Sequence, residues 1–364
     1  MPFNKFSKSY PVDNYNFWRR TLKFNGYKEK ERLILFLDEF HTVKGIGQLL
    51  KNIYDNHPDI KIFATGSSSL EVVKHLKESL AGRKCIYCLY PLTFKEFISF
   101  KDEEFAGRLE NSNLSILPKI IVDELSRFVK EFCIFGGYPA VVLAYNESDK
   151  KDALRNIFDL FIKKDLLEFL NIKNPDAALN ILRYLALNIG NIINYSDLCT
   201  TNHIDINTLK KYLHILNETF IIKSISPFFT NKNKEIVKAP KIYFFDSGAR
   251  NYFIKDFTPF ALRRDNGFLG ENLFFSQMEK KKDYFTTIKY WRDKNGREVD
   301  FILEESGSLK AYEVKCKTNI KRKDLSNLFF FKSLYKDAQI SLVNIEPTQD
   351  LRLKDLTSYS YFEV

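Results

Sequence analysis

The chain has 364 residues, of which 45% are hydrophobic and 28% charged, and its formal net charge is +10. This composition excludes collagen-like, low-complexity and disulfide-scaffold proteins, and no apolar run approaches the roughly 18 residues of a membrane span. The first ten residues lack the apolar stretch of a signal peptide, so we expect a cytoplasmic protein with no membrane partner. The mild positive charge permits contact with DNA without requiring it.

The cysteines do not predict a zinc site. Among the five, Cys85 and Cys88 are the closely spaced pair, and no second Cys pair or His pair stands at ligand spacing. The segment from Cys85 to Tyr90 alternates as a strand does, which predicts two buried thiols.

The first chemical motif follows an apolar run at residues 33–37, which is typical of a strand buried on both faces of a parallel sheet. Asp38 and Glu39 come directly after it. Ligands of open α/β sheets bind at the carboxyl ends of strands. There Asp38 can hold Mg²⁺ and Glu39 can polarise an attacking water, which is the Walker B pattern. Acids also follow buried strands for structural reasons alone.

The next segment predicts a helix over residues 49–54 and a second strand from Ile60, parallel to the first. Thr65 and Ser67 follow this strand, where their hydroxyls can sense a γ-phosphate or the attacking water. Arg83 lies further on. It can face a nucleotide, including one held by a neighbouring subunit of a homo-oligomer, or it can be a solvated loop cation.

These residues resemble a family of prokaryotic AAA-type ATPases. The matching signatures are Leu-Asp-Glu-Phe-His at 37–41, Ala-Thr-Gly-Ser-Ser-Ser-Leu at 64–70, Gly-Arg at 82–83, Tyr-Pro-Leu-Thr-Phe-Lys-Glu-Phe at 90–97 and Phe-Gly-Gly-Tyr-Pro at 135–139. The resemblance implies a parallel-sheet core that binds ATP with Mg²⁺. In that core Glu39 is catalytic, Asp38 holds the metal, and Asp38, Thr65, Ser67 and Arg83 contact the nucleotide.

One part of the family pattern does not occur in this sequence. The Gly-x-x-x-x-Gly-Lys-Ser/Thr loop, which cradles phosphates with backbone amides, is not found before the acidic pair, and the first glycine is Gly26. Two explanations stay open: the chain is a fragment, or it descends from an ATPase that lost its site. ATP is therefore expected for complete relatives, while tight binding by this chain is not.

Residues 106–175 predict a helical lid or linker. Ile157, Leu160, Phe161 and Leu167 recur at helical spacing and predict one apolar face.

Residues 176–250 predict a winged helix, made of three helices and a β-hairpin. Asp205 or Asn207 can cap the third helix, and residues 231–234 form the turn of the hairpin. Between residues 206 and 241 there are seven lysines and two acids, a local charge of +5 that suits contact with DNA phosphates. The alternative is a winged helix that packs against protein.

The C-terminal part contains a second set of chemical residues. Glu271 lies early in a predicted helix, and Asp300 lies in the returning strand of a hairpin whose turn contains Gly296. Glu313 and Lys315 lie two apart on the next strand and so face the same way. If Asp300 ends the adjacent strand, the carboxylates can hold Mg²⁺, Glu271 can complete its shell, and Lys315 can orient a metal-bound water.

This arrangement resembles the PD-(D/E)xK nuclease fold over about residues 265–343, in the domain of unknown function that follows the core in the same ATPase family. The resemblance implies Mg²⁺-dependent phosphodiester cleavage. Asp300, Glu313 and Lys315 are then catalytic, and Glu271, Asp300 and Glu313 are metal ligands. The fold also has members that only bind.

The sequence thus predicts a multidomain α/β protein with four parts. These are a partial ATPase core (1–105), a helical lid (106–175), a winged helix (176–250) and a nuclease-like α/β domain (251–364). Three functions follow: an AAA-family ATP-binding protein that acts on nucleic acid or a partner, an ATP-independent Mg²⁺ nuclease, and a non-enzymatic DNA-binding or assembly protein.

Overall fold

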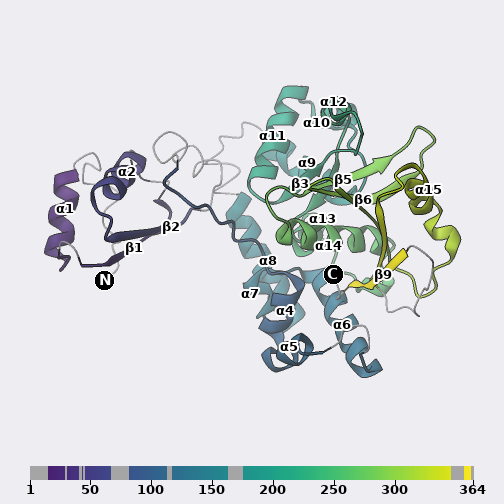
Figure 1. Ribbon diagram of the computed structural model, residues 1–364, viewed down its shortest axis with the longest axis horizontal. Helices are drawn as coiled ribbons and strands as arrows, with labels where there is room; N and C mark the ends of the chain where they lie inside the picture. The colour runs from purple at the N-terminus through teal and green to yellow at the C-terminus, as the bar shows by residue number, and fades with distance from the viewer. Residues whose placement is uncertain are drawn as a thin grey trace. The chain divides into compact units, whose positions relative to one another are not determined.

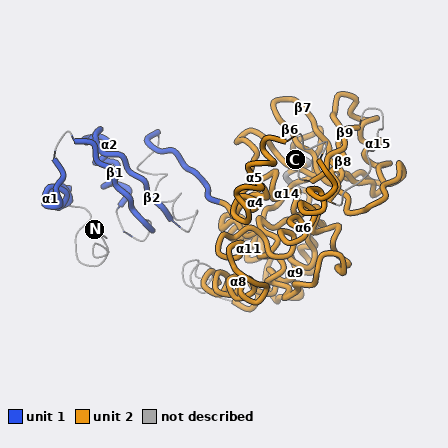
Figure 2. The backbone as a smooth tube through the Cα atoms, turned by 90° about the horizontal axis from the view of Figure 1, so that it is seen from below, with its two compact units in different colours: residues 1–89 blue, residues 90–364 orange. Residues whose placement is uncertain are grey.

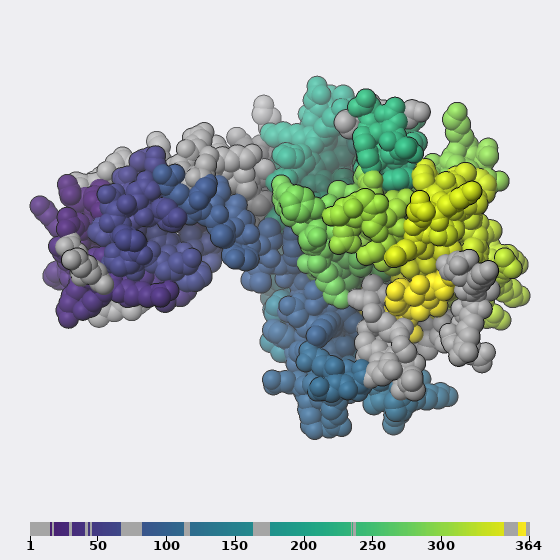
Figure 3. Space-filling view, in the orientation of Figure 1, coloured from purple at the N-terminus to yellow at the C-terminus, as the bar shows by residue number. Residues whose placement is uncertain are grey.

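The computed structural model describes residues 15–28, 31–40, 43, 46–66, 82–112, 117–162, 175–345 and 356–361. The chain forms two compact units, residues 1–89 and residues 90–364 (Figure 2). The three predicted domain boundaries all fall inside the second unit, where they stay predictions. In the space-filling view the teal residues, which follow residue 175, lie beside the green residues of the C-terminal part (Figure 3).

The first unit is built on a strand–helix–strand segment. Its elements are α1 (Tyr15–Phe24), β1 (Leu33–Leu37), α2 (Ile46–Asn56) and β2 (Ile60–Ala64). The two strands pair in parallel, as predicted. Their core with α1 and α2 includes Leu22, Leu35, Leu49, Leu50 and Ile53. The parallel pairing brings the carboxyl ends of β1 and β2 to the same edge of the sheet.

One face of this small sheet is open, so the prediction of a strand buried on both sides is wrong. Leu35 is buried, but Ile34 is 50% and Phe36 is 72% exposed. On β2, Phe63 is 49% exposed and stacks on Phe36 with ring centroids 5.4 Å apart. Parallel sheets are normally covered on both faces, and the described residues cover this one on one face.

Residues 84–90 correct a second prediction. The alternating pattern of Cys85–Tyr90 does not form a strand, and the Cys85 and Cys88 thiols are exposed. Alternation produces a strand when a partner strand supplies the ladder of hydrogen bonds.

The second unit begins with helices α4 (Phe94–Lys101), α5 (Glu103–Glu110), α6 (Lys119–Phe135), α7 (Pro139–Val142) and α8 (Glu147–Phe161). α6 ends at Gly136, whose φ of 76° is left-handed. The predicted apolar face of α8 is partly wrong. Leu154 and Phe158 are its buried apolar residues, whereas Leu160 is 52% exposed. Leu167 lies outside the described residues.

The next elements are α9 (Pro175–Leu187), α10 (Tyr195–Asn202), α11 (Ile206–Glu218), β3 (Ile222–Ile225), α12 (Lys232–Val237), β4 (Lys241–Phe244) and α13 (Ser247–Ile254). Three helices and an antiparallel strand pair thus occur in the predicted order. Asp205 caps α11 by accepting the N–H groups of Asn207 and Thr208. The predicted turn at residues 231–234 is wrong, because the Asn231 side chain caps a helix there.

A five-stranded sheet forms the C-terminal part, which is drawn in green to yellow in Figure 1. Its order is β5 (Thr287–Arg292), β6 (Glu298–Glu305), β7 (Ser308–Lys315), β8 (Gln339–Asn344) and β9 (Leu356–Ser360). β5 to β7 are antiparallel and β7 to β9 are parallel. Phe301 of β6 packs on α14 (Asn266–Lys281), and its neighbour Ile302 packs with α15 (Ser326–Leu334). The two helices therefore cover opposite faces.

Hydrogen bonds join this sheet to the preceding region. The Phe228 N–H donates to the Tyr290 carbonyl at 2.6 Å, and the Tyr290 N–H donates to the Ser226 carbonyl at 3.2 Å. α12 is fastened beside them, because Lys289 of β5 pairs with Glu235 of α12 at 2.7 Å and with Glu304 of β6. The helix that replaces the predicted wing turn is thus tied to the sheet.

We expect Lys289→Met to lower the free energy of unfolding by about 2–3 kcal/mol, because Glu235 and Glu304 lose their buried cation and keep the more exposed Lys232. Urea denaturation measures the loss. The control is Lys310→Met, which removes a half-exposed pair with Glu305 and should cost no more than about 1 kcal/mol. Equal losses in the two variants would contradict the structural role of Lys289.

Candidate functional site

The regular pairing of β5 with β6 is interrupted at Asp300. On β5, Tyr290 lies opposite two residues of β6, Asp300 and Phe301. An extra residue of this kind bends the strand and redirects its side chains. The Asp300 side chain therefore need not follow the alternation of side chains along β6. No sequence pattern of β6 indicates this.

The buried carboxylates of β6 and β7 meet through the backbone of β7. Asp300 Oδ2 accepts the Val314 N–H at 2.8 Å, at the residue between Glu313 and Lys315. Lys315 Nζ donates to Glu313 Oε1 at 2.5 Å. Asp300 and Glu313 are 9% and 6% exposed. The structure therefore brings together the three residues that the sequence predicts to converge.

Glu271 reaches this place because α14 approaches the ends of β7 and β8 closely. A Cβ on Gly270 would overlap Cys316 Sγ and lie 2.9 Å from Ile345 Cγ1, so glycine is required for this approach. The Tyr243 hydroxyl of β4 donates to Glu271 Oε2 at 3.3 Å. Glu271, Asp300, Glu313 and Lys315 are together called the carboxylate centre below.

Burial and mutual repulsion govern the charges of the centre. Burial raises the pKa of Glu271 far above its usual range, and the nearby Asp300 raises it further. Burial also raises the pKa of Asp300, and burial together with Asp300 raises the pKa of Glu313 to about 8. Burial alone would lower the pKa of Lys315, but Glu313 and Asp300 raise it. The centre thus favours an added cation.

The donor atoms of the centre fit a magnesium ion. Glu313 Oε2 is buried and has no hydrogen-bond partner among the described residues, which leaves an oxygen for a cation. Within the same residues, no group of three or more His, Cys, Asp and Glu side chains is placed to hold a metal, so Glu271 as a third ligand stays a prediction. Mg²⁺ commonly takes one or two carboxylates and completes its shell with water and phosphate.

Three further residues lie beside the centre and were not among the predicted site residues. Lys241 and Tyr243 lie on β4, and Glu298 begins β6. Lys241 is 2% exposed and forms an ion pair with Glu298, and its charge lowers the pKa of Glu271 and Asp300. The alternation of Lys241 and Tyr243 along one strand was the available signal, but their partners lie about 30 to 60 residues away.

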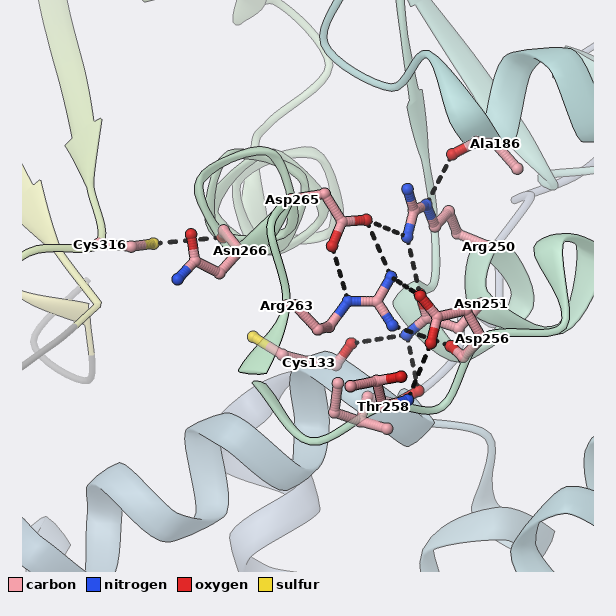
Figure 4. Close-up of polar contacts among 11 residues, drawn as sticks. Cys133, Ala186, Arg250, Asn251, Asp256, Thr258, Arg263, Asp265, Asn266 and Cys316 are labelled. Carbon is pink, nitrogen blue, oxygen red and sulfur yellow. Dashed lines mark hydrogen bonds and ion pairs between the residues drawn. The ribbon is translucent and has the colours of Figure 1, made fainter. Parts of the chain in front are cut away.

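A separate network of buried arginines holds the start of α14 (Figure 4). Asp265, just before α14, accepts Arg263 Nε at 2.7 Å and pairs with Arg250 Nη1 at 2.7 Å. Arg250 of α13 also donates to the Ala186 carbonyl at 2.6 Å. These contacts fix α9, α13 and α14 to one another. Asp265 lies five residues before Gly270, where α14 approaches the ends of β7 and β8.

In the first unit, the acidic pair and a hydroxyl meet at the carboxyl ends of β1 and β2. Thr65 Oγ1 donates to Asp38 Oδ1 at 2.5 Å, and the Glu39 N–H donates to Thr65 Oγ1 at 3.3 Å. Arg83 lies in an ion pair with Asp55 of α2 at 2.8 Å. Ser67 lies outside the described residues.

The basic character of the predicted winged helix is partly cancelled by ion pairs. Three of its seven lysines pair with acids of the C-terminal part: Lys223 with Glu279, Lys232 with Glu304 and Lys241 with Glu298. Lys210 and Lys211 on α11 are exposed. The exposed positive charge of α11 is therefore less neutralised than that of the strand pair.

Comparison with known proteins agrees with the N-terminal resemblance. Residues 7–98 match the family described as "AAA domain". Residues 126–259 and 266–362 match two families described as domains of unknown function, DUF8612 and DUF4143. The chain therefore has an AAA-type ATPase-like region followed by a DUF4143 region. None of these descriptions assigns a nuclease or a winged helix.

The similar curated proteins are uncharacterized. One from Haemophilus influenzae is 24% identical over 95% of this chain and 81% of its own length. Two from Methanocaldococcus jannaschii are 28% and 30% identical, over 74% and 60% of this chain and 58% and 47% of their own lengths. A solved structure, the Walker-type ATPase of Pyrococcus abyssi, is 19% identical, covers 68% of each chain and has a TM-score of 0.43. Among the described helices, none has the length and apolar character needed to cross a bilayer.

We expect Gly270→Ala to destabilise the chain by about 1–3 kcal/mol, because the added methyl group overlaps Cys316 and forces α14 away from β7. The matched control is Gly267→Ala in the same helix, where nothing lies within 4 Å of the added Cβ. It should stabilise the helix by up to about 1 kcal/mol. Unfolding in urea measures both, and equal stabilities would show that the close approach is not required.

Proposed function

We propose that this chain is a protein of the AAA-type ATPase kind and that its first unit supplies the metal-binding and water-polarising half of a Mg²⁺–ATP site. The hydrogen bond from Thr65 to Asp38 carries the proposal, because it joins the ends of two parallel strands where such sites lie. The match of residues 7–98 to the AAA domain supports it.

The described residues of the first unit fit the Mg²⁺ ion of such a site better than they fit the phosphates of ATP. Asp38 is exposed and keeps a second carboxylate oxygen for a hydrated Mg²⁺. The Gly-rich phosphate loop does not occur in this sequence, so the backbone amides that usually give nucleotide affinity are not supplied by that motif. We therefore expect ATP affinity in the millimolar range. We propose hydrolysis of ATP, and action on a partner or nucleic acid, for proteins of this kind that contain the phosphate loop.

Titration with fluorescent ATP and Mg²⁺ tests this function. Saturable binding at millimolar ATP should weaken about tenfold in Asp38→Asn, because the variant loses the metal-binding charge. Glu31→Gln, which removes an exposed acid of the same unit paired with Lys28, should leave the affinity unchanged. An absence of saturable binding, or equal weakening by both substitutions, would contradict the proposal.

A second function is favoured by the carboxylate centre: Mg²⁺-dependent cleavage of phosphodiesters. The order α14, β5, β6, β7, α15, β8 agrees with the PD-(D/E)xK fold that the sequence resembles. Asp300 and Glu313 would hold the ion, which when bound lowers the pKa of its water. Lys315, fixed by Glu313, would orient the attacking water or balance the charge that develops on the phosphate. Exposed Lys210 and Lys211 would contact the DNA backbone.

Nicking of supercoiled plasmid with and without Mg²⁺ tests this second function. Lys315→Ala should lower the nicking rate by about a hundredfold, because a positioned charge in the centre is lost. Lys310→Ala, at the other end of β7, is the matched control and should keep the wild-type rate. DNA binding without nicking in the wild-type chain would instead support a non-enzymatic DNA-binding protein.

A further inference from the structure

Lys241 is an unusually placed cation. It lies on β4, outside the five-stranded sheet, and is 2% exposed. Its ammonium group pairs with Glu298 and lies 5.3 Å from the centroid of the Tyr290 ring, opposite the bulge that contains Asp300. A lysine is rarely buried without a specific partner. This one is buried two residues from Tyr243, which contacts Glu271.

We infer that Lys241 is a built-in cation of the carboxylate centre. It neutralises Glu298, so that the remaining net negative charge of the centre is the charge that one divalent ion balances. The inference rests on the metal site of the second proposed function. Lys241 touches neither substrate nor metal in this role. It acts indirectly, through its ion pair with Glu298 and through the electrostatic field that it exerts on Asp300 and Glu271. Lys241 is therefore a positioning residue.

The count of charges supports this role. Metal binding requires the carboxylates to be ionised. Glu271, Asp300 and Glu313 then carry three negative charges, and Lys315 carries one positive charge. The net charge of −2 matches one Mg²⁺ only if Glu298, two residues from Asp300, is neutralised separately. Lys241 provides this neutralisation from a buried position, where screening by solvent is weak.

A second cation near Glu298 does not replace Lys241. Arg292 lies 3.5 Å from the same carboxylate, but its side chain is 48% exposed. Solvent screens an exposed ion pair of this kind strongly. The Lys241 side chain is 3% exposed, so its field reaches the other carboxylates with little loss. Lys241 is therefore the cation that sets the charge of the centre from outside the sheet.

Isothermal titration with Mn²⁺ at low ionic strength tests the inference on the full chain. The variants are Lys241→Met, Glu298→Gln and the two together. Losing the cation should tighten Mn²⁺ binding about tenfold, and losing the carboxylate should weaken it about tenfold. The double variant removes a neutral pair and should bind within about threefold of wild type. Lys289→Met, which breaks a buried pair elsewhere in the sheet, should keep wild-type affinity.

The order of affinities separates this role from a structural one. If Lys241 only held β4 in place, Lys241→Met would bind Mn²⁺ less tightly than wild type or equally, and that result overturns the inference while leaving the metal site intact. If wild type does not bind Mn²⁺ but Lys241→Met does, the charge role stands and the metal site of the natural chain is contradicted. If no variant binds Mn²⁺, both proposals fail.

Discussion

Placing the buried Asp300 and Glu313 and the partly buried Glu271 within range of one another's charge is the constraint on which the C-terminal part depends. Like charges in a poorly solvated place repel and favour protonation, as the raised pKa values of Glu271, Asp300 and Glu313 show. The surrounding structure offsets that cost. A backbone N–H satisfies Asp300, and Lys315 pairs with Glu313. A fold built for stability alone has no need of such a cluster, so we interpret the centre as functional.

Another buried acid, Asp246, holds the helices of the same unit together. Asp246 accepts the Gly137 N–H at 2.7 Å and the Ala249 N–H at 2.9 Å. Gly137 in turn accepts the Leu92 N–H at 2.8 Å. Two signatures that the sequence shares with AAA-type ATPases, at residues 90–97 and 135–139, thus meet around one carboxylate in the second unit. Their role there is architectural, and they do not lie in the unit that contains Asp38.

Local patterns predicted the elements well where backbone preferences decided them. The apolar run before Asp38, the Asp205 cap and the glycine turn at Gly296 all lie where expected. Patterns failed where a distant partner decided the outcome. Residues 84–90 alternate but are not part of a strand, and the predicted wing turn is a helix held by Lys289. Leu160 is exposed because α8 packs against its neighbours through Leu154 and Phe158 instead.

The sequence by itself determined which chemistry is available: an acidic pair after a strand, an AAA-like order of motifs, and three acids with a lysine in the C-terminal part. It determined the shared direction of Glu313 and Lys315, because alternation in a strand is local. Only the tertiary structure decided that Asp300 and Glu271 join them, through a bulge and a glycine contact. It alone revealed Lys241, since an ion pair between residues 57 positions apart has no local signature.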